Sequence, residues 1–418
     1  MKKVLFLSIV PPFPDNQGNR LATLHLMDHV VANGFLIDAI FQPVGDRKAL
    51  AKHFNDKVNV FEVKNIDFEE SYDIRARDKI KELLQTARFD GYNEEIKKEI
   101  FHAANHFHPF AYISDKMVGM ARELLSKNRY ELIVCNYIYC LRVVKELKEM
   151  MGRTKSLVIT IDAISRLDEQ AYKHGIDTSY RACGRETERE CLDYADYVVA
   201  ISNSERDYFR SIGVSREILL SEYNAYDTLK DISIPKENFD RKEIIFAASG
   251  NPLNKKGIAE FLTRCWPSVV SRVPEAKLIV LGGASQAVPS DYKNVIIKGM
   301  VSRDELIRQM AGAALSINPV YMGTGLKIKT VEAISIGLPT VSFHAGIDGL
   351  EDLKDRAFLW AEDWIDFADK CVTLLRDSDT WNRLRTQARE AGEKRFSGTV
   401  VFKEIDRVLK LNDREMPG

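Results

Sequence analysis

One stretch of the sequence, GTGLKIKTVEAISIGLP at residues 323–339, combines residue types that suit a phosphate-bearing ligand. Gly323 and Gly325 allow backbone N–H groups to come close to a ligand. A short helix is expected to follow, ended by Gly337 with a proline behind it. The first turn of such a helix supplies further N–H donors and a partial positive charge. The stretch therefore predicts a phosphate site.

Lys327, Lys329 and Glu332 carry the charges of this stretch. The lysines either lie in solvent or add full positive charge to the phosphate site. We expect Glu332 in the first helical turn, where it either caps the helix or accepts hydrogen bonds from the vicinal hydroxyls of a ribose. Such charged bonds contribute roughly 1.5–3 kcal/mol each. Phosphate donors beside a ribose acceptor describe a nucleotide site.

Two other positions are candidates in the first half of the chain. Asp162 ends the apolar run SLVITID, where it either orients or deprotonates a hydroxyl or caps the next helix. Gly18, with Asn19 and Arg20, lies in the loop PPFPDNQGNR after the first apolar run. This loop is either an ordinary helix start or, as the family resemblance given below implies, a contact for donor phosphate or acceptor.

Two pairs of residues have the sequence spacing of metal ligands. Asp377 and Asp379 form a DxD sequence, but they lie between two amphipathic segments and are expected to cap a helix. His106 and His108 have ligand-like spacing without an evident third ligand. We predict no metal and no cofactor.

Composition narrows the class of protein. The 418 residues carry 60 basic and 61 acidic side chains, which argues against capture of a nucleic acid and leaves room for a local anion site. The six cysteines form no CxxC pair, so we expect reduced, mostly buried thiols and a cytoplasmic protein. The opening apolar run is short and meets prolines, so we interpret it as a strand and not as a signal peptide. No segment is expected to span a membrane, although peripheral attachment stays open.

Apolar runs alternate with helical patterns along the whole chain, which is typical of parallel sheets covered by helices. The expected strands lie within residues 3–10, 35–41, 58–63, 130–137, 156–162, 197–202, 243–250, 277–283, 294–299, 314–320 and 339–343. The polar segment KDISIPKENFDRKE between the two sets is the best linker. We expect one α/β domain at 1–224, a second at 225–392, and a helix at 393–418; the resemblance described next implies that the first domain binds the acceptor, that the second binds the donor, and that the helix crosses back to the first. Ligands of open α/β sheets bind at the carboxyl ends of strands, so a cleft between two facing domains is predicted.

The second half resembles the donor domain of GT-B glycosyltransferases, most closely family 4. The resemblance is carried in order by SGNPLNKKGIAEF, KLIVLGG, KGMVSRDELIRQM, ALSINPV and GTGLKIKTVEAISIGLPTV. PPFPDNQGNR, DAISR, ADYVVAIS and NAYD match more loosely in the first half. The resemblance implies two Rossmann-like domains and transfer of a sugar from a nucleotide-diphosphate sugar to an acceptor hydroxyl. It implies retention at the anomeric carbon, without a metal ion or a covalent nucleophile.

Individual residues follow from this resemblance. Glu332 matches the glutamate that holds the ribose, whereas Thr324 stands where the family has a glutamate that contacts the transferred sugar. Lys256 matches the lysine that neutralises the leaving diphosphate, but Asn251 replaces its partner arginine. Lys327 or Lys329 could supply the missing charge, and we favour Lys327.

Three other functions compete with sugar transfer. Thr324 and Asn251 allow a non-catalytic partner of an active transferase, and a nucleotide-sugar epimerase would share the architecture. A dinucleotide-dependent dehydrogenase is disfavoured because no GxGxxG follows the first strand. The donor base and sugar stay open, as do a glycan, lipid-linked or protein acceptor and the oligomeric state.

Overall fold

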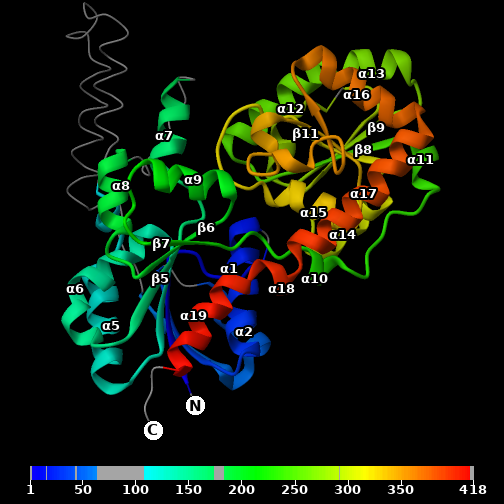
Figure 1. Cartoon of the computed structure of the whole chain (residues 1–418). Helices are drawn as coiled ribbons and strands as arrows, with labels where there is room; N and C mark the ends of the chain where they lie inside the picture. Colours follow the sequence, from blue (N-terminus) through cyan, green and yellow to red (C-terminus); the bar gives the residue numbers. More distant parts are fainter. Residues whose placement is uncertain are drawn as a thin grey trace, which may run out of the picture. The chain divides into compact units, whose positions relative to one another are not determined.

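The computed structural model describes residues 2–15, 17–42, 45–63, 108–173, 183–290 and 292–414. The chain forms two compact units, each built on one parallel sheet (Figure 1). The first unit comprises residues 1–14, 19–220 and 404–418, and the second comprises residues 15–18 and 221–403. The sequence pattern places its boundaries at 224/225 and 392/393 instead.

The first unit contains a seven-stranded sheet in the order β3-β2-β1-β4-β5-β6-β7. Its strands are β1 (Lys3–Ser8), β2 (Leu36–Phe41), β3 (Val58–Glu62), β4 (Leu132–Asn136), β5 (Lys155–Ile159), β6 (Tyr197–Ala200) and β7 (Glu217–Leu220). Central strands of a covered parallel sheet are apolar throughout. The four residues from Val4 to Leu7 are accordingly 0% exposed.

Helices cover both faces of this first sheet (Figure 1). One face carries α1 (Gly18–Ala32), α2 (Arg47–Phe54) and α19 (Lys403–Arg414). The other face carries α5 (Asp115–Lys127) and α6 (Leu141–Met151). The other α-helices that the described residues of this unit form are α7 (Ile164–Lys173), α8 (Arg185–Leu192) and α9 (Asn203–Ser211).

The second unit has a six-stranded sheet in the order β10-β9-β8-β11-β12-β13. Its strands are β8 (Glu243–Ala247), β9 (Lys277–Leu281), β10 (Val295–Gly299), β11 (Leu315–Asn318), β12 (Thr340–Phe343) and β13 (Leu359–Ala361). Within each sheet, the chain moves outward from a central strand, returns and continues on the other side. This is the strand order of a Rossmann fold.

The second sheet is also covered on both faces (Figure 1). One layer contains α12 (Pro252–Arg264), α13 (Trp266–Arg272) and α16 (Trp364–Arg376). The other contains α14 (Arg303–Gly312), α15 (Ile328–Ile336) and α17 (Ser378–Phe396). The short helices are α10 (Tyr226–Leu229), α11 (Asn238–Arg241) and α18 (Gly398–Val401).

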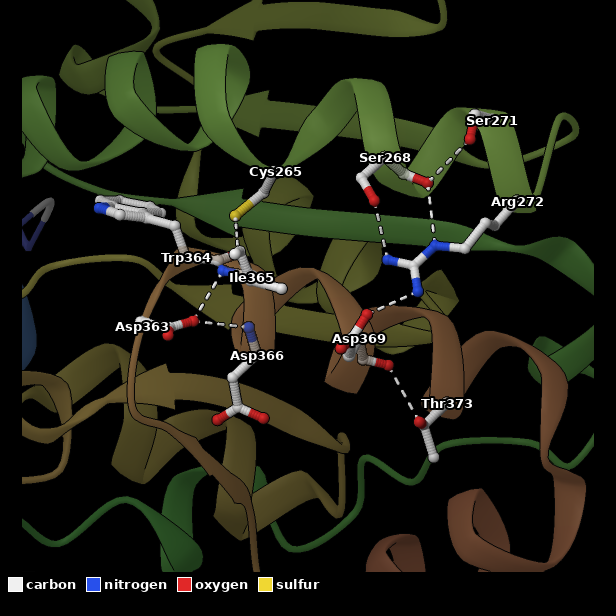
Figure 2. A network of polar contacts seen from close by, with 10 residues as sticks. All are labelled: Cys265, Ser268, Ser271, Arg272, Asp363, Trp364, Ile365, Asp366, Asp369 and Thr373. Carbon is white, nitrogen blue, oxygen red and sulfur yellow. Dashed lines mark hydrogen bonds and ion pairs between the residues drawn. The ribbon is translucent and has the colours of Figure 1, made fainter.

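Polar contacts fix α16 to α13 in this unit (Figure 2). Arg272 donates to Asp369 Oδ1 over 2.6 Å and to the backbone oxygen of Ser268 over 3.2 Å. Cys265 Sγ lies 3.0 Å from the backbone oxygen of Trp364. These contacts join the segment after β13 to the helices after β8.

All of the expected strands are present, and two further strands escaped the sequence analysis. β7 and β13 span four and three residues and form the last strands of their sheets. Edge strands this short give no extended apolar run. All six cysteines are free and buried, as expected. None of the described helices is long and apolar enough to cross a membrane.

Candidate functional site

The second sheet has its topological switch point between β8 and β11. The segments after these neighbouring strands lead into α12 and α15, so two helix N-termini follow adjacent strand ends. This edge of an open α/β sheet is where ligands bind. The predicted glycine stretch lies here, directly after β11.

Glycines allow close packing of the backbone at this edge. Gly282 has φ +81°, and a Cβ on it would lie 2.2 Å from the backbone oxygen of Ala248. A Cβ on Gly283 would lie 2.6 Å from the nitrogen of Gly250. The segments after β8 and β9 therefore touch through their main chains, which only glycine permits.

The loop before α15 adopts the conformation that its glycines suggest. Gly323 and Gly325 have φ of +111° and +78°, values that favour glycine. The N–H of Gly325 donates to Asp348 Oδ2 over 2.8 Å, and Asp348 is buried. Sequence reasoning missed Asp348, because it follows β12 and lies outside the glycine motif. Its carboxylate holds the loop in place.

Lys329 lies in the first turn of α15 and reaches towards α12. Its ammonium donates to Asn254 Oδ1 over 2.7 Å and lies 4.9 Å from the ring centroid of Phe246 on β8. Burial, and then the charge of Lys327, lower the pKa of Lys329 to about 7. Among the described residues, no carboxylate forms an ion pair with it. An anion at this position would supply the missing negative charge.

Asn254 is held in turn by the N-terminal loop of α12. The Asn251 side chain caps this helix by accepting from the N–H of Asn254 over 2.8 Å. The amide nitrogen of Asn254 donates to the backbone oxygen of Ser249 over 3.1 Å. The amide oxygen is thereby turned towards Lys329. Asn251 stands where the family that this sequence resembles has an arginine, and its role here is to cap α12.

The other two candidate lysines lie differently. Lys327 folds over its own loop, where its ammonium donates to the backbone oxygen of Thr324 and, over 2.9 Å, to that of Gly325. Lys256 is exposed on α12, with its ammonium 5.7 Å from the ring centroid of Tyr321. Burial opposes the charge of Lys329, whereas the contact with the Tyr321 hydroxyl raises the pKa of Lys256.

Thr324 is 4% exposed, and its hydroxyl has no hydrogen-bond partner among the described residues. Buried hydroxyls normally find a partner. A ligand at the glycine loop would provide one.

The expectation that Glu332 lies in the first turn of its helix is wrong. Helix α15 begins at Ile328, two residues earlier than the pattern indicates, and its first turn contains no acidic residue. Glu332 therefore does not cap this helix. Gly337 ends it in the left-handed conformation, with φ +76°, as predicted.

Glu332 instead belongs to a buried polar cluster. Its Oε1 accepts from Arg303 Nη2 over 2.6 Å and from the hydroxyl of Tyr223 over 3.3 Å. Burial opposes the charge of Arg303, but the ion pair outweighs it and raises the pKa of Arg303. No described residue donates to Oε2 of Glu332. Sequence reasoning missed Arg303 and Tyr223, since both are distant in sequence from the glycine motif.

The first-half candidates lie in separate segments. Asp162 follows β5 and precedes α7, and Gly18 is the first residue of α1. The side chain of Asn19 donates to the hydroxyl of Tyr137 over 3.1 Å, and Arg20 donates to the backbone oxygen of Phe13 over 3.0 Å. Asn19 and Arg20 thus brace the loop after β1.

The metal-like sequences have other roles. Asp377 caps α17 by accepting from the N–H groups of Asp379 and Thr380, as predicted. His108 accepts from the N–H of Phe110, whereas His106 lies outside the described residues. Within the described ranges, no group of three His, Cys, Asp or Glu side chains is arranged to hold a metal ion.

Comparison with known proteins agrees with this geometry. Residues 241–377, inside the second unit, match the family model described as Glycosyl transferases group 1. An uncharacterized 44.6 kDa protein in the cps region of Klebsiella pneumoniae is 20% identical over 97% of this chain and 99% of its own length.

Solved structures resemble the whole chain. Sucrose-phosphate synthase from Thermosynechococcus elongatus matches with a TM-score of 0.69 and 15% identity, covering 100% of both chains. Anabaena HepE in complex with UDP-glucose matches with a TM-score of 0.64 and 15% identity, covering 98% of this chain and 100% of its own. TarM matches with a TM-score of 0.65 and 10% identity, covering 98% of both chains. The two Rossmann-like units and these likenesses define a GT-B fold.

Proposed function

We propose that this protein is a glycosyltransferase that moves a sugar from a nucleoside-diphosphate sugar to an acceptor hydroxyl. The observation that carries the proposal is Lys329, a half-buried cation without a carboxylate partner among the described residues, set between the N-terminal segments of α12 and α15. The family match over residues 241–377 supports the same reaction class. Membership of family 4 and retention of anomeric configuration are part of the proposal.

In the proposed reaction, negative charge develops on the diphosphate as it leaves. The bond from the anomeric carbon to the β-phosphate oxygen breaks, and the acceptor oxygen bonds to that carbon on the same face. The acceptor proton passes to the departing phosphate, with Asp162 orienting the acceptor. Lys329 and Lys327, with the N–H groups of the glycine loop, would stabilise the developing charge without a metal ion.

The proposed donor site places the ribose at Glu332. Because Arg303 and Tyr223 occupy Oε1, Oε2 is the oxygen for the ribose hydroxyls. Thr324 offers a neutral hydroxyl to the transferred sugar, where a glutamate would offer a charge. Gly18, Gly323 and Gly325 would admit the diphosphate.

Uridine nucleotides are the first donors to test, since HepE was solved with UDP-glucose. The Klebsiella relative in the cps region makes a growing polysaccharide the preferred acceptor, ahead of a lipid-linked saccharide or a protein. We propose action in the cytoplasm, including the inner face of the membrane.

A non-catalytic partner subunit is the second candidate. Thr324 in place of a charged sugar contact and Asn251 as a helix cap both favour it. Such a subunit would bind nucleotides poorly and turn nothing over. An epimerase, in contrast, would convert a nucleotide sugar without any acceptor.

Thermal-shift measurements with EDTA, against UDP, GDP, ADP, TDP and their sugar conjugates with NAD as control, test the proposal. Selective stabilisation by one diphosphate is expected, followed by transfer to glycan acceptors. No shift with any nucleotide would favour the partner subunit, and a changed sugar without acceptor would favour the epimerase.

A further inference from the structure

The turn that carries Asp162 has a strained backbone. β5 ends at Ile159, α7 begins at Ile164, and between them Ile161 has φ +65°. A β-branched residue rarely adopts positive φ, because its side chain crowds the backbone. Such a conformation persists only when surrounding groups hold it.

Glu188 holds the end of this turn. It comes from α8, is 1% exposed, and accepts from the N–H groups of Ile164 and Ser165 over 2.7 and 3.0 Å. The hydroxyl of Ser165 donates to it as well. Three donors at a helix N-terminus are suited to an ionised carboxylate.

Glu205 holds the start of the turn. It lies on α9, is 1% exposed, and its Oε2 accepts from the N–H of Ile201 over 2.8 Å. The same oxygen lies 2.9 Å from Thr160 Oγ1. Its Oε1 is buried without a partner among the described residues.

The hydroxyl of Thr160 lies within hydrogen-bond distance of two oxygen atoms. Thr160 Oγ1 lies 2.9 Å from Glu205 Oε2 and also 2.9 Å from the backbone oxygen of Val199. A hydroxyl has one hydrogen, and a backbone oxygen can only accept. Thr160 is placed to donate to either oxygen, but it can donate to only one of them at a time. Both contacts are then satisfied only when Glu205 is a carboxylic acid.

The surroundings favour the same protonation state. Burial, and the negative charges of Asp162 and Glu188, raise the pKa of Glu205 to about 8, although the hydrogen bonds of the carboxylate with the N–H of Ile201 and the hydroxyl of Thr160 oppose this. Burial and the charge of Asp162 raise the pKa of Glu188 to about 7, against its three donors.

Other charged groups lie on the neighbouring segments. Asp168 on α7 is buried as well, with 3% of its surface exposed. Arg166 on α7 donates to Ser204 Oγ over 2.7 Å, next to Glu205 in sequence. Arg166 thus brings one positive charge to a region with several carboxyl groups.

We propose that Glu205 is a positioning residue for Asp162: as a neutral acid it bonds to Thr160 and keeps the strained turn in the conformation that presents this carboxylate to the acceptor. The inference rests on the proposed function for the role of Asp162. It does not need Glu205 to touch any substrate. Ionisation of Glu205 would remove its hydrogen bond to Thr160 and add a negative charge beside Asp162.

Carbon-13 NMR of the full chain, labelled at the glutamate carboxyl carbons, tests the protonation state directly. Glu205→Gln identifies the signal. We expect the Glu205 carboxyl to titrate near pH 8, far above an ordinary glutamate. Titration below pH 6 would overturn the inference, whatever reaction the protein performs.

Transfer kinetics test the positioning role. Glu205→Leu should lower kcat roughly tenfold or more with little change in donor KM, because only the acceptor carboxylate is displaced. Glu205→Gln keeps a donor for Thr160 and should extend the alkaline limb of the pH profile. Glu190→Gln, an exposed change on α8, is the matched control.

The outcomes separate the two proposals. Transfer by the wild type with an unaltered alkaline limb in Glu205→Gln would refute the positioning role while leaving the function standing. No transfer with any nucleotide sugar would defeat the proposed function, and the NMR titration would still decide whether Glu205 holds a proton.

Discussion

Lys329 Nζ lies 2.7 Å from Asn254 Oδ1, joining the first turns of two helices that follow neighbouring strands. Neutral Asn254 does not balance the charge of this half-buried ammonium. Lys329→Met should therefore weaken binding of a nucleoside diphosphate roughly ten- to a hundredfold, through loss of a charged hydrogen bond. Calorimetry measures the affinity, and Lys255→Met, which removes a lysine next to Asn254 on α12, is the control. Equal affinity in a folded Lys329→Met variant would assign the charge elsewhere.

The pKa of Lys329, lowered to about 7, gives binding a pH dependence. At pH 8 Lys329 is mostly neutral before a ligand binds, and a diphosphate favours its charged form. Binding at pH 8 should then take up nearly one proton through Lys329, and the uptake should fade by pH 6. Calorimetry in buffers of different ionisation enthalpy reports this, and Lys329→Met should abolish the difference. Uptake that persists in this variant would contradict the assignment.

Glu332→Ala tests the ribose contact. Loss of charged hydrogen bonds of roughly 1.5–3 kcal/mol predicts ten- to a hundredfold weaker binding of nucleotides. A 2′-deoxynucleotide should lose less affinity than the ribonucleotide in this variant. Asp304→Asn, an exposed change on α14, controls for charge. The assignment fails if the folded variant binds both nucleotides as the wild type does.

Lys327→Ala separates turnover from affinity. We expect a larger loss in kcat than in donor affinity, because charge develops on the phosphate as the bond breaks. Its contacts with the backbone oxygens of Thr324 and Gly325 give the alternative role of fixing the loop. Unchanged turnover together with a lower melting temperature would support that structural role alone.

Close backbone packing at Gly282 predicts a stability effect. Gly282 has φ +81°, and Gly282→Ala places a Cβ 2.2 Å from a backbone oxygen. Gly34 also has a positive φ, but the Cβ of Gly34→Ala has no atom within 4 Å. The conformational strain alone costs about 1–2 kcal/mol. Urea unfolding should show a clearly larger loss for Gly282→Ala than for Gly34→Ala. Equal losses would mean that the neighbouring loop moves aside.

Glu205 also links stability to pH. A glutamate whose pKa is raised to about 8 in the folded protein stabilises it fully below pH 4.5, and this contribution is lost as pH rises towards 8. Wild-type stability should fall by about 2 kcal/mol or more across this range relative to Glu205→Gln. Urea unfolding at pH 5, 7 and 9 measures the difference. Parallel pH curves for the two proteins would exclude a proton on Glu205.

The sequence was most informative where one local pattern determined the structure. Apolar runs predicted the central strands, and Gly323, Gly325 and Gly337 marked the loop and the end of α15 correctly. Contacts between distant segments could not be predicted in this way. Arg303 meets Glu332, and Asp348 meets Gly325, through tertiary packing that no spacing encodes. The start of α15 was missed because Lys327 caps it without a side-chain hydrogen bond.

Helix α19 completes the first unit from the far end of the chain. Leu220 N donates to Glu404 Oε2 over 2.9 Å, and His29 Nε2 lies 2.6 Å from Asp406 Oδ1. Residues 221–403 of the second unit are translated before α19, which contains Glu404 and Asp406. The first unit is therefore begun before the second unit and completed after it. During translation, the edge of the sheet at β7 and the surface of α1 stay uncovered until α19 has been synthesised.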